Sequence, residues 1–366
     1  MNNTAINEIQ ISLYRWFMRR TTSSAVRKIG EIPISVGSDI GAVRNENQDR
    51  VAVLKMPSFI VAVLCDGMGG MSDGTACAAK AAASFLATCV AYQNTHAVMR
   101  LQLAAQIAND SVFSQHRGQG GATLSAILFD HSGIFGVNVG DSRIYAIGEG
   151  KLEQLSTDDT MNGVLQRADN NPHPRNELIQ FIGMGGGIEP HIFSIRESYD
   201  CMMLTSDGVH YIDKQVMKSI VQHAKESALA VRRLIEVAKW CGGRDNASLA
   251  IASPSVLQAQ LFDETGVVQI WDPFGELQII NAEISGNVQA EPRQSLDKKT
   301  VVQKVVEQIA HPDKLLKKKR PTKKKTAEKV VPKVADANTD TVDTESEQPP
   351  LKIFFKGNMD KDDKHV

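Results

Sequence analysis

Six short runs of apolar residues recur between positions 60 and 252, and they constrain the fold more than any other feature of the sequence. The runs cover residues 60–65, 122–129, 134–139, 143–147, 202–205 and 247–252. Most of them end at a Gly or an Asp, as β-strands that lead into turns do. The sequence therefore predicts a domain built around several short, well-buried strands.

Helical segments lie between these runs. The Ala-rich segment 75–92 has few helix breakers, and residues 97–115 and 228–240 also have helical patterns. We expect Ser227 to cap the start of the last helix and Gly242 to cap its end. Trp240 and Phe85 are interpreted as core residues. Because strands and helices come in blocks, the pattern favours packed antiparallel sheets covered by helices over a doubly wound parallel sheet.

The sequence divides into four regions. Residues 31–253 hold these patterns and are interpreted as one mixed domain. Residues 1–30 carry apolar side chains at helical spacing, which predicts an amphipathic helix that packs on the domain. Residues 254–285 contain two strand-like runs joined by a Pro- and Gly-containing loop, the signature of a β-hairpin. Residues 286–366 are charged and predict a largely disordered tail.

The tail contains a Lys- and Arg-rich block, an acidic Thr-rich stretch and a final apolar patch at 351–355. We interpret the first two as a solvated linker. The apolar patch is a candidate recruitment motif that would add a strand to a partner sheet or dock in a partner's groove.

Composition indicates the cellular compartment. The five cysteines form no C-x-x-C pair, which indicates free thiols in a reducing environment. The N-terminus does not have the pattern of a secretory signal. No stretch approaches the ~18 apolar residues of a membrane-spanning helix. We therefore expect a cytoplasmic protein with no transmembrane segment.

Four aspartates lie at predicted strand ends or tight turns: Asp49, Asp66, Asp207 and Asp245. Each one alone is explained by ordinary turn chemistry, because Asp is common in turns. Asp66 and Asp207, however, each follow a nearly pure apolar strand, so a packed sheet would hold them rigidly at its edge. Several carboxylates gathered there would repel one another unless a cation lay between them. An oxygen-rich site of this kind suits Mg²⁺ or Mn²⁺.

Six short motifs, taken in order and spacing, resemble those of the type 2C, metal-dependent protein phosphatases, especially the bacterial ones. The motifs are Arg44…Gln48-Asp49, Asp66-Gly67-Met68-Gly69-Gly70, Gly121-Ala122-Thr123, Val139-Gly140-Asp141-Ser142-Arg143, Ser206-Asp207-Gly208 and Gly243-Arg244-Asp245-Asn246. The resemblance covers residues 31–253, and its specificity lies in the ordered set.

The resemblance implies a four-layer α/β/β/α sandwich, with two antiparallel sheets flanked by helices and with metals at one end. It implies that Asp66 bridges two Mn²⁺ or Mg²⁺ ions and that the carbonyl of Gly67 binds one of them. Asp49 would complete the first metal site, and Asp207 and Asp245 would hold the second. These four aspartates would thus form the catalytic centre.

The same resemblance implies the reaction. Arg44 would bind the substrate phosphate through its planar guanidinium. A water that bridges the metals would then hydrolyse phosphoserine or phosphothreonine. Asp141 and Asp207 are candidates for a weak third metal site, although Tyr211 stands where many members have a further Asp. Asp158-Asp159 replaces the usual Asp-His pair before a flap at about 160–190.

Two other functions stay open at this point. One is a non-catalytic regulator of the same fold that binds phosphoproteins, which the intact set of aspartates and Arg44 disfavours. The other is a metal-dependent nuclease that uses the basic block to bind nucleic acid. For the phosphatase we expect a phosphorylated protein substrate and a cognate Ser/Thr kinase as partners, and no nucleic acid.

Overall fold

The computed structural model describes residues 3–19, 24–68, 73–161, 177–257, 267–280 and 352–357. The chain divides into two compact units, one of Met1–Asn287 with Pro350–Val366 and one of Val288–Pro349. All described residues belong to the first unit. The predicted tail from 286 to 366 therefore lies outside the described residues, except for residues 352–357.

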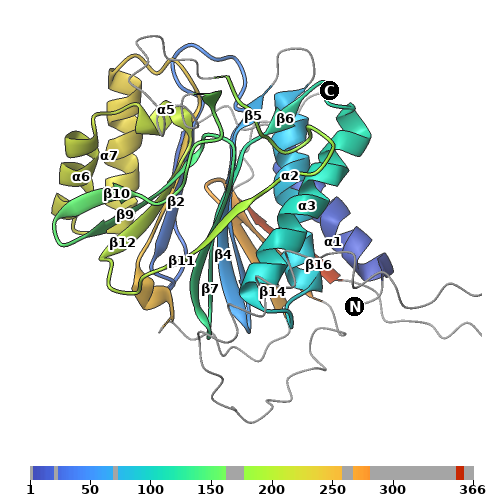
Figure 1. Cartoon of the computed structure of the whole chain (residues 1–366). Helices are drawn as coiled ribbons and strands as arrows, with labels where there is room; N and C mark the ends of the chain where they lie inside the picture. The colour runs from blue at the N-terminus through green and yellow to red at the C-terminus, as the bar shows by residue number, and fades with distance from the viewer. Residues whose placement is uncertain are drawn as a thin grey trace, which may run out of the picture. The chain divides into compact units, whose positions relative to one another are not determined.

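Two antiparallel sheets pack face to face in the first unit (Figure 1). The larger sheet has the order β11-β8-β7-β4-β3-β14-β15-β16. Its strands are β3 (Arg50–Met56), β4 (Phe59–Cys65), β7 (Leu124–Asp130), β8 (Gly133–Val139), β11 (His191–Ile195), β14 (Val267–Asp272), β15 (Gly275–Ile280) and β16 (Lys352–Gly357). The smaller sheet has the order β1-β2-β13-β12-β9-β10. Its strands are β1 (Ala25–Lys28), β2 (Ile34–Asp39), β9 (Arg143–Gly148), β10 (Lys151–Gln154), β12 (Cys201–Thr205) and β13 (Ala247–Ala252).

Helices cover the outer faces of both sheets (Figure 1). The helices α1 (Asn3–Phe17), α2 (Gly74–Ala91) and α3 (Ala97–His116) lie on the side of the larger sheet. The helices α5 (Asp207–His210), α6 (Lys214–His223) and α7 (Ser227–Trp240) lie on the side of the smaller one. A short pair, β5 (Gly67–Met68) and β6 (Gly121–Ala122), completes the described elements around one end of the sandwich, and a 3₁₀ turn spans Pro254–Leu257. The predicted α/β/β/α sandwich is confirmed.

Strand β4 shows how the sequence specifies these layers. All seven of its residues are buried, because both faces of the strand meet apolar neighbours. Ile60 and Leu64 lie in the core between the two sheets, whereas Val61 and Cys65 lie in the core beneath the helices. Side chains alternate between the two faces of a strand, so a continuous apolar run fits a strand that is covered on both sides.

The N-terminal helix belongs to this core. Ile9, Leu13, Trp16 and Phe17 of α1 are at most 3% exposed and pack in the same apolar cluster as α2. The interpretation that this amphipathic helix packs on its own domain is confirmed.

The predicted hairpin is also present, and it extends the larger sheet. Strand β14 pairs with β3 on one side and with β15 on the other. Strand β16 then pairs with β15 at the edge. The segment 352–357 is thus a strand rather than part of a structureless tail, and it adds to the chain's own sheet rather than to that of a partner.

Two details of α7 differ from the sequence prediction. Its N-cap is Glu226, and Ser227 is already helical, with its hydroxyl bonded to that of Ser35 at 2.7 Å. Trp240, expected in the core, is 91% exposed. It lies two residues after the buried Ala238, which places it on the opposite face of the helix.

Helix α2 is long and apolar enough to span a membrane by length and composition alone, which the sequence analysis did not anticipate. However, 89% of its residues are buried within the protein. Its composition reflects a central helix packed between the sheet and its neighbours α1 and α3.

The burial of α1 gives a first prediction. Leu13→Ala should lower the free energy of unfolding by about 2–5 kcal/mol, because it removes a fully buried side chain and leaves a cavity. Ile11→Ala, on the same helix but 50% exposed, should change it by less than about 0.5 kcal/mol. Urea unfolding followed by circular dichroism measures both. Equal, small effects would show that α1 does not pack as described.

Candidate active site

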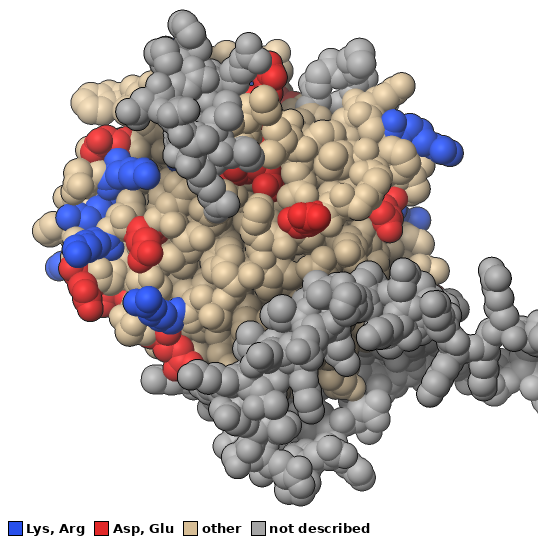
Figure 2. Space-filling model, viewed as in Figure 1, with Lys and Arg blue, Asp and Glu red and all other residues tan. Residues whose placement is uncertain are grey.

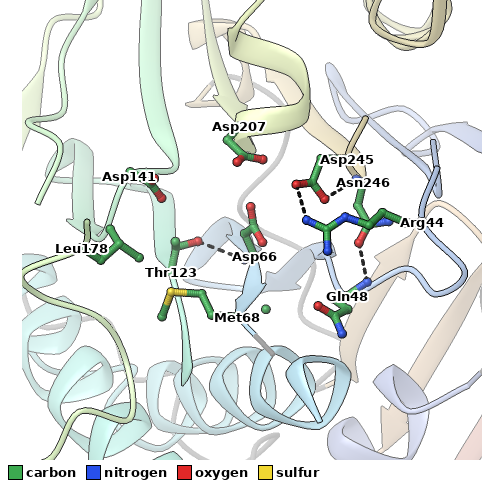
Figure 3. Close-up of a pocket in the computed structure, with 11 residues that line it drawn as sticks. Arg44, Gln48, Asp66, Met68, Thr123, Asp141, Leu178, Asp207, Asp245 and Asn246 are labelled. Atoms are coloured by element: carbon green, nitrogen blue, oxygen red, sulfur yellow. Dashed lines mark hydrogen bonds and ion pairs between the residues drawn. The ribbon is translucent and has the colours of Figure 1, made fainter. Parts of the chain in front are cut away.

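A polar cavity of about 420 Å³ opens at the end of the sandwich where α5, β5 and β6 lie. Figure 3 shows acidic side chains from both sheets pointing into it. The residues that line it are Arg44, Gln48, Asp66, Gly67, Met68, Thr123, Asp141, Leu178, Asp207, Asp245 and Asn246. Most of the predicted site residues are therefore brought together in one place.

Strand pairing explains this convergence. Asp49 directly precedes β3 and Asp66 directly follows β4, and the two strands pair antiparallel with Arg50 opposite Cys65. Asp207 follows β12 and Asp245 precedes β13, which also pair antiparallel. The end of a strand and the start of its antiparallel neighbour lie at the same edge. Each sheet therefore contributes two aspartates to one end of the sandwich.

Asp49 lies deepest, at 3% exposure and behind the cavity. Its Oδ2 accepts a hydrogen bond of 2.9 Å from the Ser206 hydroxyl, and its backbone N–H donates to the Asn47 side chain at 3.0 Å. Among the described residues, its Oδ1 has no hydrogen-bond partner although it is buried. Burial raises the pKa of Asp49 to about 6, since a desolvated carboxylate is disfavoured.

Asp66 and Asp207 are shifted in the same direction. Burial raises the pKa of Asp66 well above its usual range, and the charges of Asp49 and Asp207 add to this shift. Burial, followed by the charge of Asp245, raises the pKa of Asp207 to about 7. Asp207 Oδ1 is a second buried oxygen without a hydrogen-bond partner among the described residues. The protein therefore holds carboxylates together that electrostatics would drive apart.

Arg44 and Asp245 form an ion pair at the mouth of the cavity, with 2.7 Å between Nη2 and Oδ2 (Figure 3). Both side chains are partly exposed, at 49% and 30%. A surface pair of this kind contributes little stability, so it can be exchanged for other partners at small cost. Arg44 is thus placed to donate to an anion that enters the cavity.

Asn246 connects the loop of Arg44 to the loop of Asp245. Its side-chain oxygen accepts from the Gln48 backbone N–H at 2.8 Å, and its side-chain nitrogen donates to the carbonyls of Ile40 and Glu46 at 2.9 and 3.0 Å. Its own backbone N–H donates to Asp245 Oδ1 at 2.8 Å. Asn246 therefore sets the position of both loops, a role that the sequence analysis did not assign.

Thr123 holds Asp66 in a similar way. Its hydroxyl accepts from the Asp66 backbone N–H at 3.0 Å, and its own N–H donates to the Asp66 carbonyl at 2.8 Å. The hydroxyl also pairs with that of Ser142 at 2.6 Å. Both backbone groups of Asp66, its N–H and its carbonyl, are thus bonded to Thr123.

Gly67 is required by close packing. A Cβ at this position would lie 2.2 Å from the carbonyl oxygen of Gly74 and 2.8 Å from that of Gln48. Any other residue would force the Asp66 turn away from the start of α2. The carbonyl of Gly67, the predicted ligand, belongs to the segment that lines the cavity. The following residues 69–72 lie outside the described residues.

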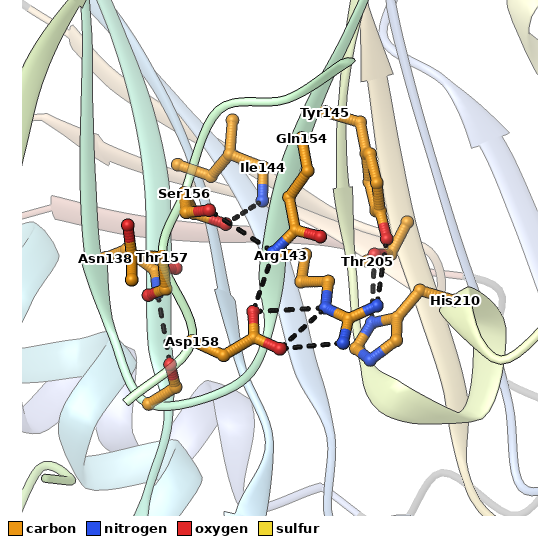
Figure 4. A network of polar contacts seen from close by, with 11 residues as sticks. Asn138, Arg143, Ile144, Tyr145, Gln154, Ser156, Thr157, Asp158, Thr205 and His210 are labelled. Carbon is orange, nitrogen blue, oxygen red and sulfur yellow. Dashed lines mark hydrogen bonds and ion pairs between the residues drawn. The ribbon is translucent and has the colours of Figure 1, made fainter. Parts of the chain in front are cut away.

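Asp141 lies on the other side of the cavity, at the start of a separate polar network. Burial and the charge of Asp158 raise its pKa. Asp158 itself forms a bidentate pair with Arg143, which also bonds to the Tyr145 hydroxyl at 3.1 Å (Figure 4). This pair fixes the end of β9 beside the loop of Asp141.

Asp159 connects the same loop to the last part of the predicted flap and to the residue that begins β11. Its Oδ2 accepts from the Gly140 N–H and from the Gln180 side chain, both at 2.9 Å. Its Oδ1 lies 2.7 Å from Nε2 of His191. Residues 162–176, the central part of the flap, lie outside the described residues. Leu178, which follows them, borders the cavity and was not identified from the sequence.

The donor set fits hard divalent cations. All candidate ligands are oxygens, which Mg²⁺ and Mn²⁺ prefer, and two of them are buried without a hydrogen-bond partner among the described residues. As the side chains lie, no three His, Cys, Asp or Glu residues of the described segments are close enough to hold an ion. That separation is expected, because carboxylates repel and Asp245 is engaged by Arg44.

The chain is similar to known proteins. A family model of protein phosphatase 2C matches residues 41–250. The serine/threonine protein phosphatase PstP of Mycobacterium tuberculosis is 29% identical over 230 residues, which cover 59% of this chain and 43% of that protein. This chain therefore spans less than half of the relative's length.

Two solved structures are similar. One is the PPM Ser-Thr phosphatase MsPP from Mycobacterium smegmatis in complex with cacodylate, with 30% identity and a TM-score of 0.52 over 60% of this chain and 97% of that one. The other is the catalytic domain of PstP in complex with two manganese ions, with 27% identity and a TM-score of 0.52 over 63% of this chain and 98% of that one.

The raised pKa values predict how stability depends on pH in EDTA. An acid whose pKa is higher in the folded than in the unfolded state binds more protons when folded, so stability falls as pH rises. For Asp207 this fall spans about pH 3.8 to about 7. Asp207→Asn should stabilise the metal-free protein at neutral pH by up to about 4 kcal/mol, because the pKa of Asp207 is raised by about three units and one unit corresponds to about 1.4 kcal/mol.

Thermal unfolding in EDTA across this pH range tests the prediction. The two proteins should converge at the acidic end, where the carboxyl is protonated. Parallel curves over the whole range would contradict the electrostatic description of the site.

Proposed function

The chain belongs to the protein phosphatase 2C family, a family of metal-dependent serine/threonine protein phosphatases, and we propose that it hydrolyses phosphoserine and phosphothreonine in proteins. One observation carries the proposal. Asp66, Asp207 and Asp245 line one cavity with Arg44, and Asp49 is buried at the same end of the sandwich. Buried oxygens of Asp49 and Asp207 have no hydrogen-bond partner among the described residues. A degenerate, non-catalytic member would not need to keep this costly arrangement.

The proposed centre contains two Mn²⁺ or Mg²⁺ ions. Asp66 would contact both ions, Asp49 and the carbonyl of Gly67 would complete the first site, and Asp207 with Asp245 would hold the second. The two manganese ions reported for the PstP structure support this number. Asp141, which borders the same cavity, would hold a weak third ion together with Asp207.

The cations, when bound, would acidify a water for attack on phosphorus and offset the charge of the phosphate. The chain's own residues do the rest. Arg44 exchanges Asp245 for two oxygens of the substrate phosphate, which its planar guanidinium matches. Asn246 and Thr123 keep the carboxylates in place during this exchange, because their bonds to the backbone do not involve Arg44. The cavity volume of about 420 Å³ is sufficient for a phosphorylated side chain.

A nuclease is the less favoured alternative. On the face seen in Figure 2, Lys and Arg side chains of the described residues are interspersed with Asp and Glu along the side of α6 and α7. This mixed distribution does not favour binding of a polyanionic strand by that face, since nucleic-acid binding relies on concentrated positive charge. The proposed partners are thus a phosphorylated protein and a cognate Ser/Thr kinase.

The proposed location is the cytoplasm. Cys65 and Cys89 are buried as free thiols, and Cys201 and Cys241 are also not in disulfides. Free thiols suit a reducing compartment.

Phosphate release from a phosphothreonine peptide tests the proposal. The wild-type protein should turn over with Mn²⁺ or Mg²⁺ and not with EDTA. Asp66→Asn should reduce kcat by at least about 10²-fold, since it removes the charge between the proposed ions. Asp200→Asn is the matched control. Asp200 is an exposed aspartate that precedes β12, so it lies at the opposite end of that strand from Asp207 and the cavity. No turnover by folded, cation-loaded wild type on several phosphopeptides would favour the regulatory alternative.

Arg44→Lys separates substrate binding from chemistry. A lysine keeps the charge but lacks the bidentate geometry, so KM for the peptide should rise by about tenfold, the loss of roughly one hydrogen bond to a charged group. The affinity for Mn²⁺ should change much less. Steady-state kinetics and a Mn²⁺ titration distinguish the two effects, and an unchanged KM would remove Arg44 from the phosphate site.

A further inference from the structure

Arg50 is a buried cation directly behind the site. It is the first residue of β3, follows Asp49 in the chain and is 6% exposed. Its guanidinium donates to three backbone carbonyls: Nε to Phe17 at 2.5 Å, and Nη1 to Asn47 at 2.8 Å and to Asp49 at 2.6 Å. One side chain thus connects the last residue of α1 to the loop that carries Asp49.

The environment of Arg50 explains why a buried charge is tolerated there. The C-terminal end of a helix carries partial negative charge on its unpaired carbonyls, and Phe17 is the last residue of α1. The carboxylates of Asp49 and Asp272 add further attraction. Burial of an unpaired guanidinium would cost several kcal/mol, so these contacts make its position well determined.

The end of α1 is itself fastened to the turn between β14 and β15. Arg19 stacks on the ring of Trp16, with its guanidinium carbon 3.3 Å from the ring centroid, and donates to the Trp16 carbonyl at 2.7 Å. It also forms an ion pair with Asp272, whose other oxygen accepts from the Phe274 N–H at 2.8 Å. A water-sized cavity of about 10 Å³ is bordered by residues of α1, of this turn and of the 49–51 segment, which shows that the three meet at one point.

All polar groups of Asp49 except one therefore have a hydrogen-bond partner. Its carbonyl and that of Asn47 are held by Arg50, its N–H is held by the Asn47 side chain, and its Oδ2 is held by Ser206. The remaining oxygen, Oδ1, has no hydrogen-bond partner among the described residues. This is the arrangement expected of a ligand that is oriented before its ion arrives.

Of the three carbonyls that accept from Arg50, those of Asn47 and Asp49 lie in the part of the chain that matches the family model, and that of Phe17 lies outside it. The match covers residues 41–250, whereas α1 spans Asn3–Phe17 and β14 and β15 lie at Val267–Asp272 and Gly275–Ile280. Segments outside the matched region therefore contact the site through Arg50, which lies inside that region.

We propose that Arg50 is a positioning residue of the metal centre, through which α1 and the β14–β15 turn hold Asp49 in the orientation that binds a divalent cation. The inference rests on the proposed function, since it assigns Asp49 to an ion. It goes further by making α1 and the hairpin parts of the catalytic unit rather than docking elements.

The test is direct Mn²⁺ binding to the full chain by isothermal titration calorimetry, without substrate. Arg50→Met removes the three hydrogen bonds and should weaken Mn²⁺ binding about 10- to 100-fold, the usual effect of losing a residue that orients a ligand. Arg50→Lys should restore part of that loss. Arg100→Met is the matched control, because Arg100 is 3% exposed and bonded to Thr95 and Asp130, at the opposite end of β4 from Asp66. It should lower the melting temperature and leave Mn²⁺ affinity unchanged.

Arg19→Gln tests the contribution of α1 to Mn²⁺ binding. Arg19 is partly exposed, so the variant should fold, and it should weaken Mn²⁺ binding in the same direction but less than Arg50→Met. If circular dichroism shows that Arg50→Met is unfolded, the Mn²⁺ affinities of the two single variants Arg50→Lys and Arg19→Gln test the inference instead.

These measurements distinguish a failure of the role of Arg50 from a failure of the proposed function. Wild-type affinity in the Arg50 variants would overturn this inference and leave the proposed function standing, whereas absence of Mn²⁺ binding by the wild type would overturn both. Wild-type affinity in Arg19→Gln alone would overturn the role assigned to α1.

Discussion

Electrostatic repulsion among buried aspartates is the constraint around which this end of the protein is organised. Asp49, Asp66 and Asp207 are all shifted toward the protonated form, chiefly by burial and further by the charges of neighbouring aspartates. Such a cluster lowers the stability of the metal-free protein, because the fold prevents the side chains from separating. The aspartates stand at the ends of strands that are largely buried on both faces, so moving one of them would disturb the core of a whole sheet.

The polar network around the cavity carries this rigidity into the loops. Asn246 joins the loops of Arg44 and Asp245, Thr123 fixes the peptide of Asp66, and Asp159 joins the loop of Gly140 to Gln180. The bonds of Asn246 and Thr123 go to backbone groups, which leaves the Asp66 and Asp207 side chains to a ligand. Cation binding would relieve the charge repulsion of the empty cluster, and the acidic side chains would have to move closer together to surround an ion.

The sequence allowed the sandwich, the hairpin and the convergence of the aspartates to be predicted, because each rests on local patterns. Apolar runs specify strands, and the Asp residues after Cys65 and Ser206 mark where those strands end. The roles of Asn246, Thr123 and Arg50 could not be predicted, since they depend on which loops the fold brings together. Strand β16 was missed for the same reason: its partner β15 lies more than 70 positions earlier in the chain, as Gly357 pairs with Gly275. Trp240 was wrongly assigned to the core because it is apolar. Its position along the helix places its side chain on the solvent-facing side.

Crystals soaked with Mn²⁺ and measured for anomalous scattering would show whether these aspartates hold two ions. We expect anomalous peaks on both sides of the Asp66 carboxylate, with Asp49 Oδ1 and Asp207 Oδ1 as ligands and with the Arg44–Asp245 pair open or weakened. No peak in the cavity at saturating Mn²⁺, or ions bound only at other carboxylates while both oxygens stay unpaired, would contradict it.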